Sequence, residues 1–194
     1  MLMQRALDIA RGFVGVREKG SNAGREVEIF QRSAGIGKGE PWCAAFVYYC
    51  IYEAAKAMGY PDPFKDIKLK GYTVAYLEWA RDNGMFVTGQ HTPGSLFLLY
   101  YPKLGRVGHI GFIAGAPDDG YVPTIEGNTN AGGSRSGDGV YERRRSAKSF
   151  HRIFTYPPEM WKYTWRELDA YLVAKKDKKA LELLHKTRSL LPLK

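Results

Sequence analysis

The feature of this sequence that most constrains its fold is a change of periodicity near Gly94. Before it, apolar residues recur at helical spacing over residues 2–14, around Val27 and Phe30, and over 42–58 and 72–83. After it come short β-branched or aromatic segments between Gly, Pro and Asp turns, at 95–101, 109–115, 121–127, 139–145 and 150–156. Helices first and strands afterwards predict an α+β fold, in which N-terminal helices pack on an antiparallel meander.

A pair of prolines at residues 157 and 158 marks a boundary in the chain. We expect residues 1–156 to form the main domain, because 194 residues suit one domain with an appendage. Residues 157–194 are rich in lysine and have amphipathic helical spacing. They predict a basic, helical C-terminal extension, whose leucines should pack on the main domain.

The N-terminus does not resemble an export signal, because Asp8 and Arg11 interrupt its apolar residues. No apolar run approaches the length of a membrane span, so we expect no stable membrane insertion. The sequence thus predicts synthesis in the cytoplasm without a signal peptide. If the protein acts outside the cell, something other than a signal peptide must release it.

The formal net charge of +9 indicates an anionic partner. Nucleic acid, anionic lipid and anionic cell-wall polymer all have the required sign. The sequence has no helix-turn-helix, zinc-finger or RNA-reading motif, so we do not expect nucleic acid to be the partner.

The two cysteines, Cys43 and Cys50, fall on one predicted helix. A structural zinc site needs four ligands, commonly with other spacings than that of these two cysteines. A disulfide between them is also excluded, because seven residues of helix separate them by about 10.5 Å. Cys50 is expected to be an apolar core residue. Cys43 follows Pro41 and Trp42 at the helix start, where the positive end of the helix dipole favours a thiolate. From this residue alone, a buried structural thiol remains the alternative.

A base for Cys43 is offered by His109, which lies at a strand start with Gly108 and Gly111 clearing space around its ring. Glu126 and Asn128 follow at the end of the next strand. A cysteine with a base oriented by a third group is the general form of an activated nucleophile. We predict Glu126 as the principal orienting group, because a carboxylate stabilises an imidazolium. Asn128 is predicted in the following loop, supporting the site or touching substrate.

The ordered segments "PWCAAFV", "GHIGFI" and "IEGN" resemble the cysteine, histidine-dependent amidohydrolase/peptidase (CHAP) family, over roughly residues 5 to 155. The resemblance implies a papain-like fold and hydrolysis of peptidoglycan. It also implies Cys43 as nucleophile, His109 as base, Glu126 as orienting acid and Asn128 as the accompanying asparagine. The chain departs from the family at Trp42, where many members have Gln. That departure leaves the oxyanion-hole side chain unassigned and makes a calcium site unexpected.

We therefore expect a peptidoglycan hydrolase, resembling an endolysin or a secreted lytic effector. It would act as a monomer on bacterial peptidoglycan, with no cofactor and no metal. The bond cut would be that of an N-acetylmuramoyl-L-alanine amidase or of a stem-peptide or cross-bridge endopeptidase. Candidate substrate-binding residues are Trp42, Gly108 and Asn130. Two alternatives stay open: a non-catalytic wall-binding or virion structural module, and a cytoplasmic cysteine amidase with a small substrate.

Overall fold

A computed structural model describes residues 2–132 and 137–156, together with four single residues near the C-terminus, Lys176, Lys178, Lys179 and Glu182. The chain divides into two compact units, Met1–Tyr156 and Pro157–Lys194. The predicted helical extension, and its packing on the main domain, lie outside the described residues apart from those four. All that follows concerns the first unit.

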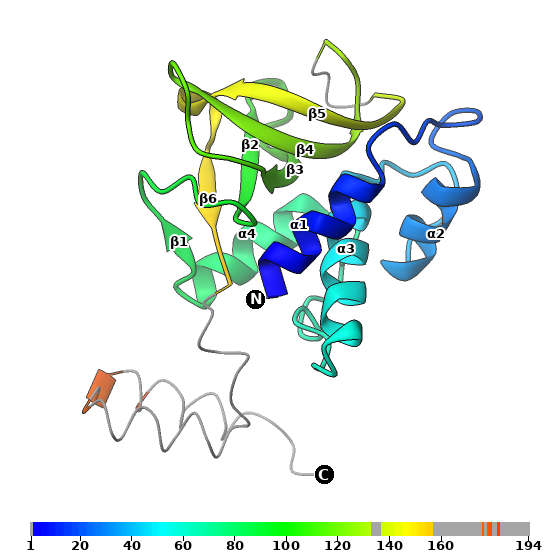
Figure 1. Ribbon diagram of the computed structural model, residues 1–194. Coiled ribbons are helices and arrows are strands. Elements are labelled where there is room, and N and C mark those ends of the chain that lie inside the picture. Colours follow the sequence, from blue (N-terminus) through cyan, green and yellow to red (C-terminus); the bar gives the residue numbers. More distant parts are fainter. Residues whose placement is uncertain (1, 133–136, 157–175, 177, 180–181, 183–194) are drawn as a thin grey trace. The chain divides into compact units, whose positions relative to one another are not determined.

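Four helices precede the sheet in the described part of the chain, each within a segment of predicted helical spacing (Figure 1). They are α1 (Leu2–Gly12), α2 (Arg25–Ser33), α3 (Cys43–Ala57) and α4 (Thr73–Asp82). The most apolar is α3, which is buried along most of its length and contacts α1 and α2. Among the described residues, no helix is both long enough and apolar enough to cross a bilayer.

The strands form one antiparallel sheet with the order β1-β6-β2-β3-β4-β5. They are β1 (Phe86–Val87), β2 (Leu96–Tyr101), β3 (Arg106–Ile113), β4 (Tyr121–Thr129), β5 (Gly139–Ser146) and β6 (Arg152–Phe154). Two 3-10 turns, η1 (Pro102–Leu104) and η2 (Ala147–Ser149), join β2 to β3 and β5 to β6. The α+β prediction is confirmed.

The meander prediction holds for β2 to β5 and is wrong for the last strand. From β5 the chain crosses back, so that β6 pairs with β2 and also with β1, a two-residue strand that the sequence analysis did not predict. This return buries Ile153 against Phe97 and Val122, which a strand added beyond β5 would not reach. Burial of apolar surface therefore decides the strand order.

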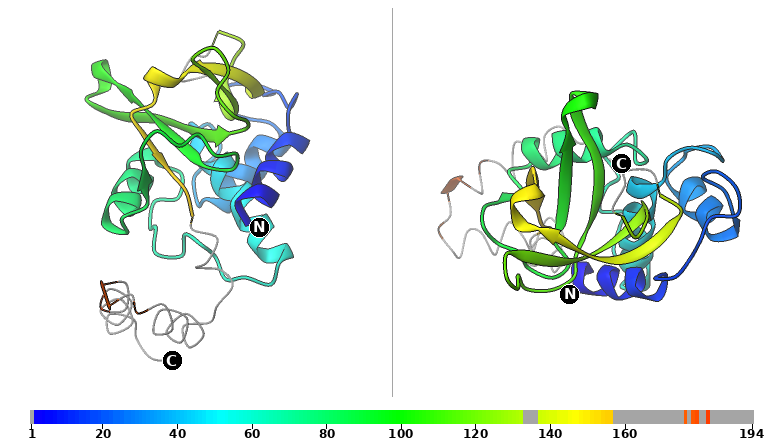
Figure 2. Two further views of the ribbon diagram at one scale, coloured as in Figure 1. Left: turned by 60° about the vertical axis from the view of Figure 1, so that its left-hand side comes forward. Right: turned by 90° about the horizontal axis from the view of Figure 1, so that it is seen from above.

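The sheet has two different faces (Figures 1 and 2). Helices α1, α3 and α4 lie against one of them, where the ring of Phe46 on α3 meets Phe112 on β3 edge-on. The strand pairing places Phe97 and His109 on the opposite face, which carries a smaller apolar cluster. The base predicted from the sequence therefore lies on the face away from the helix core.

Contact between β4 and α3 requires a glycine at position 127. A Cβ atom there would lie 2.7 Å from Cγ of Phe46 and 2.8 Å from Cζ3 of Trp42, and both side chains are fully buried. At such distances either the rings or the backbone must shift to accept a Cβ. The backbone of β4 thus lies too close to the start of α3 for any side chain at position 127.

We expect Gly127→Ala to lower the free energy of unfolding by about 1–3 kcal/mol, the usual cost of overpacking a core. Chemical denaturation followed by circular dichroism measures it. The control is Gly12→Ala at the end of α1, where a Cβ meets no atom within 4 Å. Equal effects of the two substitutions would contradict the proposed close approach.

Candidate active site

The two cysteines occupy different environments on the same helix. Cys43 is the first residue of α3 and is 5% exposed, whereas Cys50 lies two turns further along and is fully buried. Burial raises the pKa of the Cys50 thiol well above its ordinary value, so that this side chain stays a neutral core residue. Cys43 lies where the unpaired N–H groups of the helix end favour an anion.

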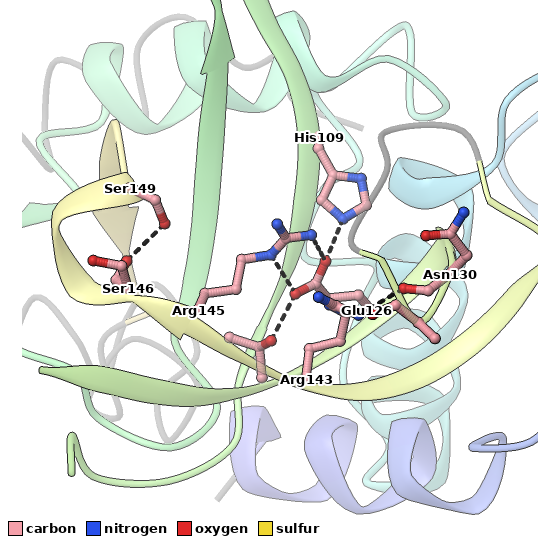
Figure 3. A network of polar contacts seen from close by, with 9 residues as sticks. His109, Glu126, Asn130, Arg143, Arg145, Ser146 and Ser149 are labelled. Carbon is pink, nitrogen blue, oxygen red and sulfur yellow. Dashed lines mark hydrogen bonds and ion pairs between the residues drawn. The ribbon is translucent and has the colours of Figure 1, made fainter. Parts of the chain in front are cut away.

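His109, on β3, is fully buried and its Nε2 lies 2.7 Å from Oε2 of Glu126 (Figure 3). Among the described residues, Nδ1 has no partner at regular hydrogen-bonding geometry. Burial alone favours the neutral ring, but interaction with the Cys43 thiol and then with the Glu126 carboxylate outweighs burial and raises the pKa of His109 to about 9. Nδ1 is thus the atom left to exchange a proton with Cys43.

The Glu126 carboxylate is fully buried and is bound from three sides. Oε1 accepts from the Thr124 hydroxyl at 2.6 Å and from Nε of Arg145 at 2.7 Å, and Oε2 accepts from Nη2 of Arg145 at 2.5 Å. Burial acts to raise the pKa of this carboxyl, but the hydrogen bonds from Arg145 and His109 hold it well below its usual range. Glu126 is therefore ionised, and its Oε2 faces Nε2 of His109.

A β-bulge adjoins each of the two strand positions. In the pairing of β2 with β3, Leu99 opposes His109 and Tyr100 opposes Val107, so Gly108 is an extra residue. In the pairing of β4 with β5, the register shifts between Glu126 and Thr129. Bulges change the direction in which nearby side chains point and often occur beside active sites.

Asn128 does not contact His109 in the described structure. Strand β4 continues to Thr129, so the prediction that Asn128 lies in a loop is wrong. Its backbone is left-handed (φ 56°) within the bulge, and its Oδ1 accepts from the backbone N–H of Trp42 at 3.1 Å. The bulge therefore turns this amide away from the histidine and toward the start of α3.

The amide nitrogen of Asn128 joins that helix start to an N-terminal loop. Nδ2 donates to Oδ1 of Asn22 at 3.0 Å and to Oε1 of Glu18 at 3.3 Å, and the same Glu18 oxygen accepts from the Trp42 indole at 2.7 Å. Asn128 thus supports the residue before Cys43 rather than the base.

The candidate substrate-binding residues differ in how accessible they are. Trp42 is fully buried and bound to Glu18, so its side chain offers no surface to a substrate, contrary to the sequence-based assignment. Gly108 is also buried and belongs to the bulge before His109. Asn130 is half-buried just after β4, and its carbonyl accepts from Arg143 at 2.7 Å. Substrate binding by Gly108 and by Asn130 stays a prediction.

Gly111 makes room for a different group than the sequence suggested. A Cβ at this position would lie 2.9 Å from Cγ of Glu126 and 2.9 Å from Cε1 of Phe97. The glycine therefore accommodates the carboxylate side chain and the Phe97 ring, rather than the imidazole.

Four polar residues of the site escaped the sequence analysis: Glu18, Asn22, Thr124 and Arg145. One available signal was the alternation along β4 of Thr124 with Glu126, which places both on one face. For Arg145 the only available signal was that a buried carboxylate needs a cation beside it. The chain carries 29 lysines and arginines, so this need does not identify which of them supplies the charge.

We expect the melting temperature to be highest between about pH 4.5 and 6.5 and to fall on either side. The pKa of His109 rises from 6.5 to about 9 on folding, so its stabilisation is complete below pH 6.5 and is lost as the pH rises toward 9. The pKa of Glu126 falls from 4.5, so its stabilisation is lost as the pH drops below 4.5. Scanning calorimetry across pH measures both losses.

The control is His109→Gln, which cannot titrate. The melting temperature of this variant should change little between pH 6.5 and 9. It should still fall at acidic pH, as in the wild type. An unchanged alkaline decline would show that another group titrates there.

Comparison with known families gives one match. Residues 35–128 match the family model of the CHAP domain, a stretch that begins eight residues before Cys43 and ends at Asn128. No curated protein and no solved structure matched the chain. The matched stretch contains Cys43, His109, Glu126 and Asn128, and the α+β architecture is compatible with the papain-like fold of that family. Residues 35–128, just under half of the chain, are thus similar to the CHAP domain, which is consistent with the CHAP family.

Proposed function

We propose that this protein hydrolyses an amide bond of bacterial peptidoglycan, with Cys43 as the nucleophile. The observation that carries the proposal is the buried series Cys43, His109 and Glu126, contributed by the start of α3, by β3 and by β4. The CHAP domain supports an amidohydrolase or peptidase with peptidoglycan as substrate.

The proposed reaction has two steps. The Cys43 thiolate attacks the carbonyl carbon, the C–N bond breaks, and His109 gives its proton to the departing amine. Water then attacks the thioester, His109 takes up a proton from it, and the thiolate leaves. During both steps the backbone N–H groups in the first turn of α3 point toward the oxyanion, since they have no partner within the helix.

Glu126 stabilises the imidazolium that exists before the first proton transfer and again after the second. Its full burial strengthens this interaction, because the charges are not screened by water. Asn128 and Glu18 contribute indirectly, by fixing the residue that precedes the nucleophile.

Two bond types are compatible with this chemistry. An N-acetylmuramoyl-L-alanine amidase frees the amino group of the first stem residue, whereas an endopeptidase frees amino groups within the stem or the cross-bridge. Mass spectrometry of digested peptidoglycan distinguishes them.

The biological setting that we propose is that of an endolysin or a secreted lytic effector. Such a protein is made in the cytoplasm and reaches the wall after release by a holin or a secretion system. The net charge of +9 supports this setting, because it would draw the protein to anionic wall polymer.

We expect Cys43→Ala to reduce lysis of purified walls by at least about 10³-fold, because the variant has no nucleophile. The matched control is Cys50→Ala, which alters a buried thiol of the same helix and should reduce stability while retaining turnover. Zymograms and turbidity assays measure lysis, and thermal melts check folding.

Lysis by folded Cys43→Ala would refute the assignment of the nucleophile. A wild-type protein that binds walls without cleaving them would instead be a wall-binding or virion structural module. Cleavage of simple glutamyl or alanyl amides, with intact walls untouched, would identify a small-substrate amidase.

Glu126→Gln should lower kcat by about 10²-fold or more with KM little changed, because a neutral amide cannot stabilise the imidazolium. Asn128→Asp should instead lower the melting temperature, since its new carboxylate would face Glu18, now 3.3 Å from the Asn128 nitrogen. Steady-state kinetics on a soluble muropeptide, with melts, separate the two effects. Near-normal turnover in Glu126→Gln, with turnover lost in well-folded Asn128→Asp, would make Asn128 the third catalytic member.

A further inference from the structure

We propose that Arg145 is a positioning residue of this active site, which aims the Glu126 carboxylate at His109 and supplies the positive charge that allows Cys43 and His109 to exist as a thiolate–imidazolium pair. The inference rests on the proposed function, because it assigns a role within the same site. Arg145 lies on β5, outside the segment that matches the family model.

The geometry of the Arg145–Glu126 pair is that of an orienting clamp (Figure 3). Nε binds Oε1 at 2.7 Å and Nη2 binds Oε2 at 2.5 Å, so the planar guanidinium engages both oxygens. Such bidentate pairs fix direction as well as distance, which a single hydrogen bond does not. The carboxylate cannot rotate about its terminal bond without losing both contacts.

Arg145 binds the same carboxylate oxygen that contacts His109. Oε2 of Glu126 accepts from Arg145 and also lies 2.7 Å from Nε2 of His109. Arg145, Glu126 and His109 thus form a continuous series, and His109 also interacts with Cys43. The side chains of Glu126 and His109 are fully buried, and that of Arg145 is 13% exposed.

Counting charges gives Arg145 its second role. With Glu126 and Arg145 both ionised, the site is neutral when Cys43 and His109 are uncharged, and it is also neutral when they form a thiolate and an imidazolium. Without Arg145, the ion pair at Cys43 and His109 would leave one unbalanced negative charge among buried groups. An unpaired buried charge is costly, so the thiolate would take up a proton instead.

The neighbouring residue, Arg144, forms an exposed ion pair on the same strand. Arg144 binds Asp118 at 3.0 Å, and their side chains are 57% and 78% exposed. Exposed pairs of this kind contribute little and are screened by salt. Arg144 therefore provides a matched control, with the same charge on the same strand but outside the site.

The test compares Arg145→Met and Arg144→Met by the pH dependence of Cys43 alkylation with iodoacetamide, measured by mass spectrometry of the labelled peptide. Removing a buried positive charge raises the proton affinity of every group beside it. We expect the pH of half-maximal alkylation to rise by at least about one unit in Arg145→Met. It should stay at the wild-type value in Arg144→Met, and Arg145→Lys should restore part of the difference.

The pH dependence of kcat gives a second, independent measurement. At pH 7, Arg145→Met should lose about 10-fold or more in kcat with KM little changed, and recover part of that loss as the pH is raised. A residue needed only for folding would lower the amount of active protein equally at every pH.

If Arg145→Met does not fold, Glu126→Gln and the double variant Glu126→Gln with Arg145→Met replace it. In the Glu126→Gln background the arginine is unbalanced, so adding Arg145→Met should raise the pH of half-maximal alkylation. Overlapping alkylation profiles with and without Arg145 would overturn the inference. Because alkylation needs no peptidoglycan, a wild-type protein that fails to cleave walls would refute the proposed function and leave this test intact.

Discussion

The candidate site depends on one interaction, the buried pair of the Glu126 carboxylate with the Arg145 guanidinium. A carboxylate at zero exposure is stable only when its charge is balanced and its oxygens are bound. Arg145 and Thr124 meet that need from β5 and β4, and one oxygen still faces His109. Interaction with Cys43, and with this ionised carboxylate, raises the pKa of a histidine that burial alone would leave neutral.

A second polar network surrounds the residue before Cys43, the proposed nucleophile. Asn128 and Glu18 bind the backbone and the indole of Trp42, the residue that caps α3 just before Cys43. Gly127 lets β4 approach the same helix start closely. Two nearby residues of strand β4 therefore face different partners, since Glu126 contacts His109 and Asn128 binds the start of α3. The bulge between them makes this reversal possible, because it breaks the strict alternation of side chains.

Much of the fold was predictable because its elements have strong local signals. Apolar spacing identified α1 and α3, and the turn residues around the strands identified β2 to β5. The strand order escaped prediction at β6, because pairing with β2 is decided by burial of Ile153 and Phe154 rather than by distance along the chain. A two-residue strand such as β1 has no periodicity from which it could be predicted.

The sequence by itself determined the chemistry that is available: one cysteine at a helix start, one histidine between glycines, and a glutamate and an asparagine at the end of the next strand. Residue types and short-range spacing suffice for that, because helix starts and strand ends are local features. Only the tertiary structure decided that Arg145 completes the site, that Asn128 serves the helix instead of the histidine, and that Trp42 is buried. These outcomes depend on charge balance in a buried space and on two β-bulges, and such long-range constraints leave no periodic trace in the sequence.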